Sequence, residues 1–180
     1  MTGLALVAEP FIELLLTEKW LPCVPFLQIS CFTYAFWPIH TANLQAIKAM
    51  GRSDIFLKLE IAKKIIGIIV LVLAIRHGVL VIAATGILTT IIMMFINAYP
   101  NRKLIGYTYF EQIKDLLNSF VPLMGMLITV LIVGTLELNA FYMLILKTLT
   151  GAISYILLSA MVKNESFNYI FSVVKDFKKK

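Results

Sequence analysis

Apolar residues occur in long blocks along the chain, and short polar turns separate these blocks. The hydrocarbon core of a bilayer is about 30 Å thick, so a helix needs about 20 mainly apolar residues to cross it. We therefore expect an all-α fold, a multi-pass transmembrane helix bundle over residues 17–162. Its helices are expected at about residues 21–47, 54–75, 79–98, 116–136 and 140–162.

The two ends of the chain differ from these blocks. Residues 1–16 are apolar but short, and we expect a partial or short membrane helix there. Apolar sequence begins abruptly at Leu4. This start predicts the C-terminal portion of a longer protein, whose missing N-terminal helices are its partners. Residues 163–180 combine lysines with apolar side chains at helical spacing, typical of a basic amphipathic tail on the cytoplasmic membrane surface. A disordered basic end is the alternative.

One proline interrupts the first of the long blocks. Pro22 and Pro25 fall in the opening turns of residues 21–47, where proline is tolerated. Pro38 lies inside the block, where it removes a backbone donor and crowds the preceding turn. The sequence therefore predicts a kink near Pro38.

The distribution of basic residues predicts the orientation of the bundle. Of the 16 Lys and Arg residues, Lys147 lies inside a span, and only Lys19 and Arg76 fall in one set of connections. The alternate set holds Lys48, Arg52, Lys58, Lys63, Lys64, Arg102, Lys103, Lys114, Lys163, Lys175, Lys178, Lys179 and Lys180. Because basic connections stay in the cytoplasm, we expect the C-terminus to be cytoplasmic and the Lys19 connection to face outward.

Composition supports the membrane assignment. The chain has 60% hydrophobic and 14% charged residues, with a mean hydropathy of +0.90, whereas soluble domains have about 25% charged residues. The net charge of +6 flanks the apolar blocks, so it indicates topology and contact with anionic membrane lipids. No nucleic-acid partner is expected.

Polar residues recur on one face of the predicted helix at residues 21–47. These positions are three or four residues apart or multiples of that spacing, so they project from the same side of a helix. The candidates for a substrate path on this face are Gln28, Tyr34, Thr41 and Gln45. A polar stripe in a membrane helix faces other helices or a water-filled cavity. Interhelical hydrogen bonding and cavity lining both remain open.

Two further candidate sites carry charge. Glu9 and Glu13 are four residues apart and share a face, so they could bind a coupling cation or proton, or simply lie at the outer interface beside Lys19. Lys147 lies eight residues after Asn139, or about 12 Å along the helix. Two interpretations of Lys147 stay open: a substrate-path residue facing a cavity, or a side chain that snorkels to the interface.

Motifs for covalent chemistry are absent from the sequence. It contains no metal-binding pair of histidines, no nucleophile beside a base and no glycine-rich phosphate loop. Asp54 and Glu60 are a sparse acidic pair, which favours a solvated surface over a metal site. Cys23 and Cys31 are expected to be free thiols. We therefore expect no catalytic residues, no metal, no cofactor and no enzymatic activity.

Two stretches resemble the oligosaccharide flippases. They are "LLLTEKWLPCVPFLQI", which includes Lys19 and Trp20, and "QAIKAMGRSDIFLKLEIAKK", which includes Gly51, Arg52 and Lys58. In order and spacing they are similar to Wzx-type polysaccharide or O-antigen transporters, within the multidrug/oligosaccharidyl-lipid/polysaccharide exporter superfamily. Members of that family have two helix bundles facing a central cavity, and this chain resembles part of the second bundle.

The resemblance implies a function and a location. It implies a translocase that flips an undecaprenyl-pyrophosphate-linked oligosaccharide across the bacterial cytoplasmic (inner) membrane for O-antigen or capsule synthesis, alongside polysaccharide polymerase machinery. Its mechanism would be alternating access of the two bundles. Two alternatives remain open: a cation-coupled drug or toxin extruder of the same superfamily, and a small membrane scaffold or interaction protein.

Overall fold

The computed structural model describes residues 1–136 and 138–162, and every regular element in this part of the chain is helical. The expected all-α fold is confirmed. The α-helices are α1 (Thr2–Leu6), α2 (Ala8–Leu16), α3 (Val24–Ala35), α4 (Trp37–Ala49), α5 (Ser53–Ala74), α6 (Val79–Leu104), α7 (Tyr109–Val133) and α8 (Ala140–Met161). Two short 3-10 helices, η1 (Glu18–Cys23) and η2 (Ile75–His77), connect them. The expected tail at residues 163–180 lies outside the described residues.

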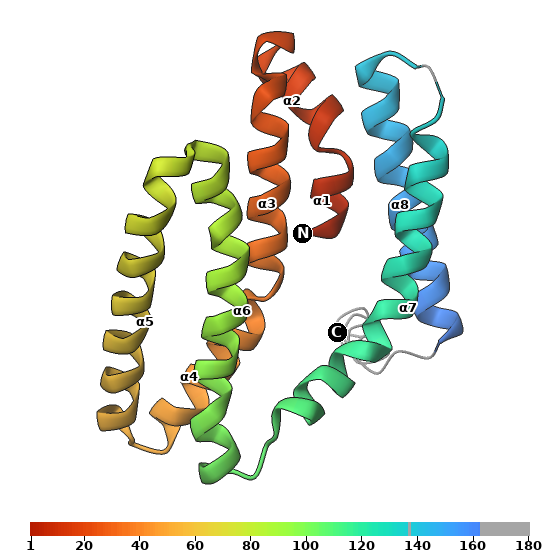
Figure 1. Cartoon of the computed structure of the whole chain (residues 1–180). Coiled ribbons are helices and arrows are strands. Elements are labelled where there is room, and N and C mark those ends of the chain that lie inside the picture. Colours follow the sequence, from red (N-terminus) through yellow and green to blue (C-terminus); the bar gives the residue numbers. More distant parts are fainter. Residues whose placement is uncertain (137, 163–180) are drawn as a thin grey trace, which may run out of the picture.

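The helices form two groups that α1 and α2 connect. Helices α5 and α6 form an antiparallel hairpin beside α3 and α4, while α7 and α8 form a second hairpin (Figure 1). Helix α1 packs against both α3 and α7, and α2 packs against both α3 and α8. Direct contact between α6 and α7 is small by comparison. The short N-terminal helices therefore fill the space between the two groups.

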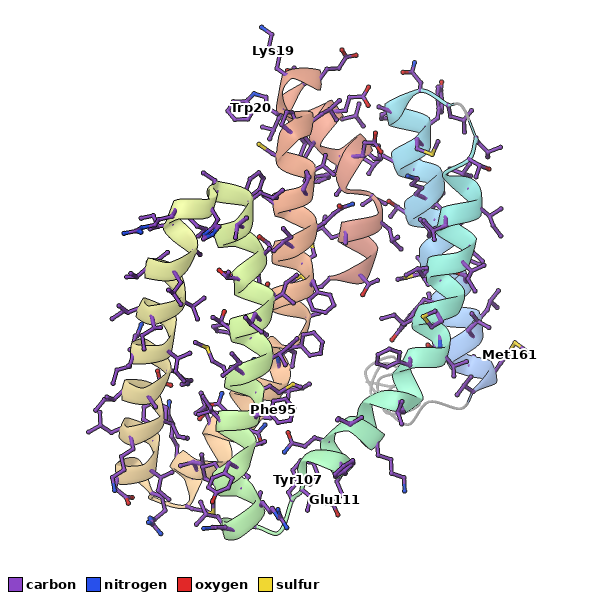
Figure 2. The ribbon with its side chains drawn as sticks, viewed as in Figure 1. Lys19, Trp20, Phe95, Tyr107, Glu111 and Met161 are labelled. Atoms are coloured by element: carbon purple, nitrogen blue, oxygen red, sulfur yellow. The ribbon has the colours of Figure 1, made fainter. Side chains whose placement is uncertain are left out.

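Successive long helices run in opposite directions along one common axis (Figure 1). The α5–α6 and α7–α8 turns lie at the same end as Lys19 and Trp20 (Figures 1 and 2). The α4–α5 turn lies at the opposite end, where Tyr107 and Glu111 also lie (Figures 1 and 2). We call these the Lys19 end and the Tyr107 end.

Large apolar side chains cover the outer surface of the helices. Examples are Ile68 on α5, Val79 on α6 and Ile132 on α7, which are 61%, 71% and 64% exposed. In the described part of the chain, α6 and α8 are long and apolar enough to cross a membrane. Apolar surface of this extent is suited to contact with lipid.

The block expected as one helix at residues 21–47 is interrupted. Its first residues belong to η1, which contains Pro22, and the rest divides into α3 and α4 at Phe36. Pro38 lacks the N–H that would bond to the carbonyl of Tyr34, and its ring crowds that turn. The sequence predicted a kink near Pro38, and the helix is interrupted at Phe36, two residues before Pro38.

Other helix ends also differ from the hydropathy boundaries. Helix α6 continues to Leu104, and α7 begins at Tyr109, because polar residues extend both helices past their apolar blocks. A capping box starts α7: the Glu111 N–H donates to Thr108 Oγ1, and the Glu111 carboxylate accepts from the Thr108 N–H. At the end of α4, Gly51 adopts a φ of 68°, which favours glycine.

Candidate functional site

A pocket of about 380 Å³ lies among α3, α4, α5 and α6. Aromatic, basic, acidic and amide side chains all contribute to its lining. The polar and aromatic side chains of the lining include Tyr34, Trp37, His40, Thr41, Glu60, Lys63, Lys64 and Asn97. We call this cavity the lysine pocket. Most of its charge comes from α5.

The charged residues of the lysine pocket lie well along α5. Lys63 is ten residues after Ser53, where α5 starts, which corresponds to about 15 Å along the helix axis. Lys58, Lys63 and Lys64 were counted with the basic connections, and all three lie in α5, within the helix expected at residues 54–75. In membrane helices generally, a lysine this far from a helix end pairs with a partner or faces a polar cavity.

Lys63 has such a partner. Its ammonium group forms an ion pair with Glu60, one turn earlier on the same helix, and the Lys63 side chain is only 11% exposed. Lys64 is exposed and has no ion-pair partner among the described residues. The paired charges of Glu60 and Lys63 cancel, so Lys64 gives the pocket an excess positive charge.

Helix α6 contributes a buried amide to the same pocket. Asn97 is 1% exposed, and its Nδ2 lies 3.1 Å from Nδ1 of His40 on α4. Asn97 Oδ1 has no hydrogen-bond partner. Across the pocket, the Tyr34 and Trp37 rings lie 5.8 Å apart, centroid to centroid, at the α3–α4 break. The pocket therefore offers an aromatic surface and a buried acceptor.

The four predicted residues of the polar stripe separate into two groups. Tyr34 and Thr41 line the lysine pocket, and the Thr41 hydroxyl donates to the Trp37 carbonyl one turn earlier. Gln28 donates to the Ala5 carbonyl at 3.3 Å, which ties α3 to α1. Gln45 is exposed and is not part of the pocket lining. The break at Phe36 divides the stripe between two helices.

A second pocket brings the remaining predicted residues together. Its volume is about 300 Å³, and it lies where α2 and α8 pack together. Glu9, Glu13 and Lys147 all line it, although nothing in the sequence indicates that α2 and α8 are neighbours. No ion pair within 4.0 Å joins Lys147 to either glutamate. We call this cavity the glutamate pocket.

The structure also provides space for the Lys147 side chain. A Cβ atom at Gly134, after α7, would lie 3.4 Å from Cε of Lys147. One turn along α8 from Lys147, Gly151 is buried against α7, and the Thr129 hydroxyl donates to Ser154 Oγ at 3.0 Å. The face of α8 that carries Lys147 therefore packs against protein.

A buried cluster of amides, which was not predicted from the sequence, lies near the Tyr107 end. Asn43 Nδ2 on α4 donates to Gln112 Oε1 on α7 at 2.9 Å. Asn101 Nδ2 on α6 donates to both Asn43 Oδ1 and the Asn43 carbonyl, at 2.6 and 3.1 Å. The sequence feature that could have indicated this cluster is the presence of asparagines at the ends of apolar blocks. Their pairing depends on the packing of three helices, so the sequence of any one helix does not predict it.

The other acidic pair considered from sequence does not form a site. Asp54 forms a two-point ion pair with exposed Arg52, at 3.0 and 3.1 Å, while Glu60 belongs to the lysine pocket. Hydrogen bonding to Arg52 lowers the pKa of Asp54 to about 2. Asp54 therefore remains ionised at neutral pH. In residues 1–136 and 138–162, no group of three or more His, Cys, Asp or Glu side chains could hold a metal ion.

The helical fold and its lipid-facing surface define an all-α membrane protein. The chain is similar to an "Uncharacterized membrane protein in cps region" of Klebsiella pneumoniae, with 28% identity over 166 residues. The match covers 87% of this chain and 33% of that protein, so the chain spans about a third of the relative's length. No protein-family model matches the chain. No solved structure matches it.

Proposed function

We propose that this chain is part of a translocase that moves a lipid-linked oligosaccharide across the bacterial cytoplasmic membrane for surface polysaccharide synthesis. The observation that carries the proposal is the lysine pocket, in which Lys63 lies about 15 Å along α5 beside Glu60 and Lys64, and aromatic rings of α3 and α4 complete the lining. Charges at such depth mark substrate or ion paths in membrane proteins. The similarity to a protein of a cps region supports the polysaccharide assignment.

In this proposal the chain supplies part of one helix bundle of a two-bundle transporter. The substrate is an undecaprenyl-pyrophosphate-linked oligosaccharide, whose negative charge requires cations along its path. Transport proceeds by alternating access, with one bundle rocking against the other, and involves no covalent chemistry. The missing N-terminal helices and the polysaccharide polymerase machinery are the partners. The break between α3 and α4 is a feature found near transporter sites.

The proposed topology rests on how the basic residues are distributed between the two ends of the structure. The Tyr107 end carries Arg52, Arg102 and Lys103 in or beside its connections, so it is assigned to the cytoplasm. The Lys19 end faces outward. Multi-pass insertion with a cytoplasmic C-terminus is part of the proposal.

The test is complementation of a strain that lacks its oligosaccharide flippase and makes a matching repeat unit. We expect the full-length parent of this chain to restore surface polysaccharide and to remove the accumulated lipid-linked oligosaccharide. Normal membrane expression without either effect would refute the proposed function. A Lys63→Gln/Lys64→Gln variant expressed at the same level is the matched control, and we expect it to restore little.

The glutamate pocket supports a second candidate function, a cation-coupled drug or toxin extruder. Glu9 and Glu13 provide two carboxylates in one cavity. Lys147 lines the same cavity and can neutralise one carboxylate while the other binds a cation or proton. The test is resistance to toxic organic cations in a strain lacking its own extruders. Resistance that is lost in a Glu9→Gln/Glu13→Gln variant, together with failed polysaccharide complementation, would favour the extruder.

A further inference from the structure

We propose that the lysine pocket binds the phosphate-bearing, hydroxyl-rich headgroup of a membrane lipid. The inference deepens the proposed function and rests on it only for the identity of the lipid, which is either the carried polyprenyl lipid or an anionic phospholipid. Both sources share the same chemistry, a phosphodiester or phosphate beside hydroxyl groups.

The charge of the pocket matches a phosphate group. Glu60 and Lys63 neutralise one another, and the unpaired Lys64 leaves an excess charge of about +1 at the pocket. Lysine binds phosphate as a compact point charge, without the fixed geometry that arginine needs. A headgroup phosphate can interact with Lys64 and with the Lys63 ammonium, because an ammonium group has three donors and Glu60 uses only part of this capacity.

The uncharged lining matches the rest of such a headgroup. Asn97 Oδ1 is a buried acceptor without a partner, and it requires a donor such as a hydroxyl group. The Trp37 and Tyr34 side chains are 61% and 52% exposed, so their rings can pack against the C–H face of a sugar or glycerol. A bare phosphate ion has no C–H face to pack against these rings.

The surroundings of the pocket favour a lipid over a soluble ligand. Ile61 and Ile68 share the helical face of Lys64, and they are 52% and 61% exposed. An apolar chain can therefore lie along α5 while its headgroup occupies the pocket. Lys64 is suited to join the two regions, since a lysine stem can lie along apolar surface while its ammonium group binds a polar ligand.

The experiment measures lipid binding to the purified protein by native mass spectrometry. The probes are undecaprenyl phosphate, phosphatidylglycerol, the neutral lipid phosphatidylcholine and soluble glycerol phosphate. We expect saturable binding of one or both anionic lipids, and weaker binding of phosphatidylcholine and glycerol phosphate. Preference for undecaprenyl phosphate identifies the carried lipid, and equal binding of both anionic lipids identifies a general anionic-lipid site. Either result supports the headgroup site.

Matched variants locate the binding. Lys64→Gln should weaken binding by about tenfold, the effect of losing one charge-assisted hydrogen bond, and Lys64→Arg should restore most of it. Lys58→Gln removes an equal charge from an exposed position on the same helix outside the pocket lining, so it should change binding by less than about twofold. Equal losses in Lys64→Gln and Lys58→Gln would overturn the proposal, as would equal binding of phosphatidylcholine. Intact lipid binding with failed complementation would refute the proposed function alone.

Discussion

The side chain of Asn43 donates to Gln112 Oε1 at 2.9 Å and so connects α4 with α7 across 69 positions of sequence. Asn101 on α6 donates to the same asparagine, which makes Asn43 the centre of a three-helix contact. Direct packing between α6 and α7 is otherwise small, so this amide cluster is a main connection between the two helix groups at the Tyr107 end.

Replacing the central amide should destabilise the fold. In Asn43→Ala, Gln112 Oε1 loses its donor, and Asn101 loses its closest acceptor, while both side chains stay buried. We expect the free energy of unfolding to fall by about 1–3 kcal/mol. Unfolding by heat or denaturant in detergent micelles would measure the change.

Gln45→Ala provides the control for this prediction. Gln45 lies on the same helix but is exposed, so its replacement should change the free energy of unfolding by less than about 0.5 kcal/mol. Equal stability of the Asn43 and Gln45 variants would contradict a structural role for the amide cluster.

The amide cluster illustrates what the sequence can and cannot predict. Hydropathy places the long helices because burial in lipid depends on the local run of apolar residues. Pro38 marks the α3–α4 break because proline acts through its own covalent structure. Asn43 finds Gln112 only through the packing of α4, α6 and α7, and no pattern in one sequence specifies such a distant pair.

The charge on Lys147 is expected to be important for transport. Lys147 lines a cavity with Glu9 and Glu13, and Gly134 leaves room for its side chain. In the full-length parent we expect Lys147→Ala to reduce transport by about tenfold and Lys147→Arg to retain most of it, since the charge persists. Transport would be measured as restored surface polysaccharide. Normal transport by both variants would show that this charge has no essential role.

Close packing of α7 on α8 should make Gly151 sensitive to substitution. A Cβ atom at Gly151 would lie 3.0 Å from Cγ2 of Val130, which is itself buried. Gly151→Leu should lower the free energy of unfolding by about 1–3 kcal/mol through overpacking. The measurement is thermal unfolding in detergent.

Gly67→Ala is the opposite case on α5. A Cβ atom at Gly67 meets nothing within 4 Å, and alanine is the better helix former by about 1 kcal/mol. We therefore expect Gly67→Ala to be neutral or stabilising. Destabilisation by Gly67→Ala equal to that of Gly151→Leu would argue against the packing described for α7 and α8.

The proposed topology predicts opposite accessibility at the two ends. In a background with Cys23 and Cys31 replaced by Ala, a membrane-impermeant thiol reagent should label Lys19→Cys in intact cells. Arg102→Cys, in the last turn of α6, should be labelled only after the cells are permeabilised. Labelling of Arg102→Cys in intact cells, with Lys19→Cys protected, would reverse the orientation.

The two pockets show a second limit of sequence interpretation. Glu9, Glu13 and Lys147 each stood out because charge is rare in apolar sequence, but only the contact between α2 and α8 unites them. Lys63 and Lys64 lie within the helix expected at residues 54–75, but the sequence does not show that they line a cavity. A cavity depends on which helices pack together, and the sequence of one helix does not reveal its neighbours.

In the proposed multi-pass topology, the pairing of Glu60 with Lys63 also bears on how α5 enters the bilayer during synthesis. The two residues lie one turn apart on the same helix, so their ion pair can form before α4 or α6 is in place. A paired carboxylate and ammonium carry no net charge, and together they cost less to transfer into lipid than either does alone. The helix therefore carries its own neutralising partner through the insertion machinery, and the lysine pocket can assemble around α5 afterwards.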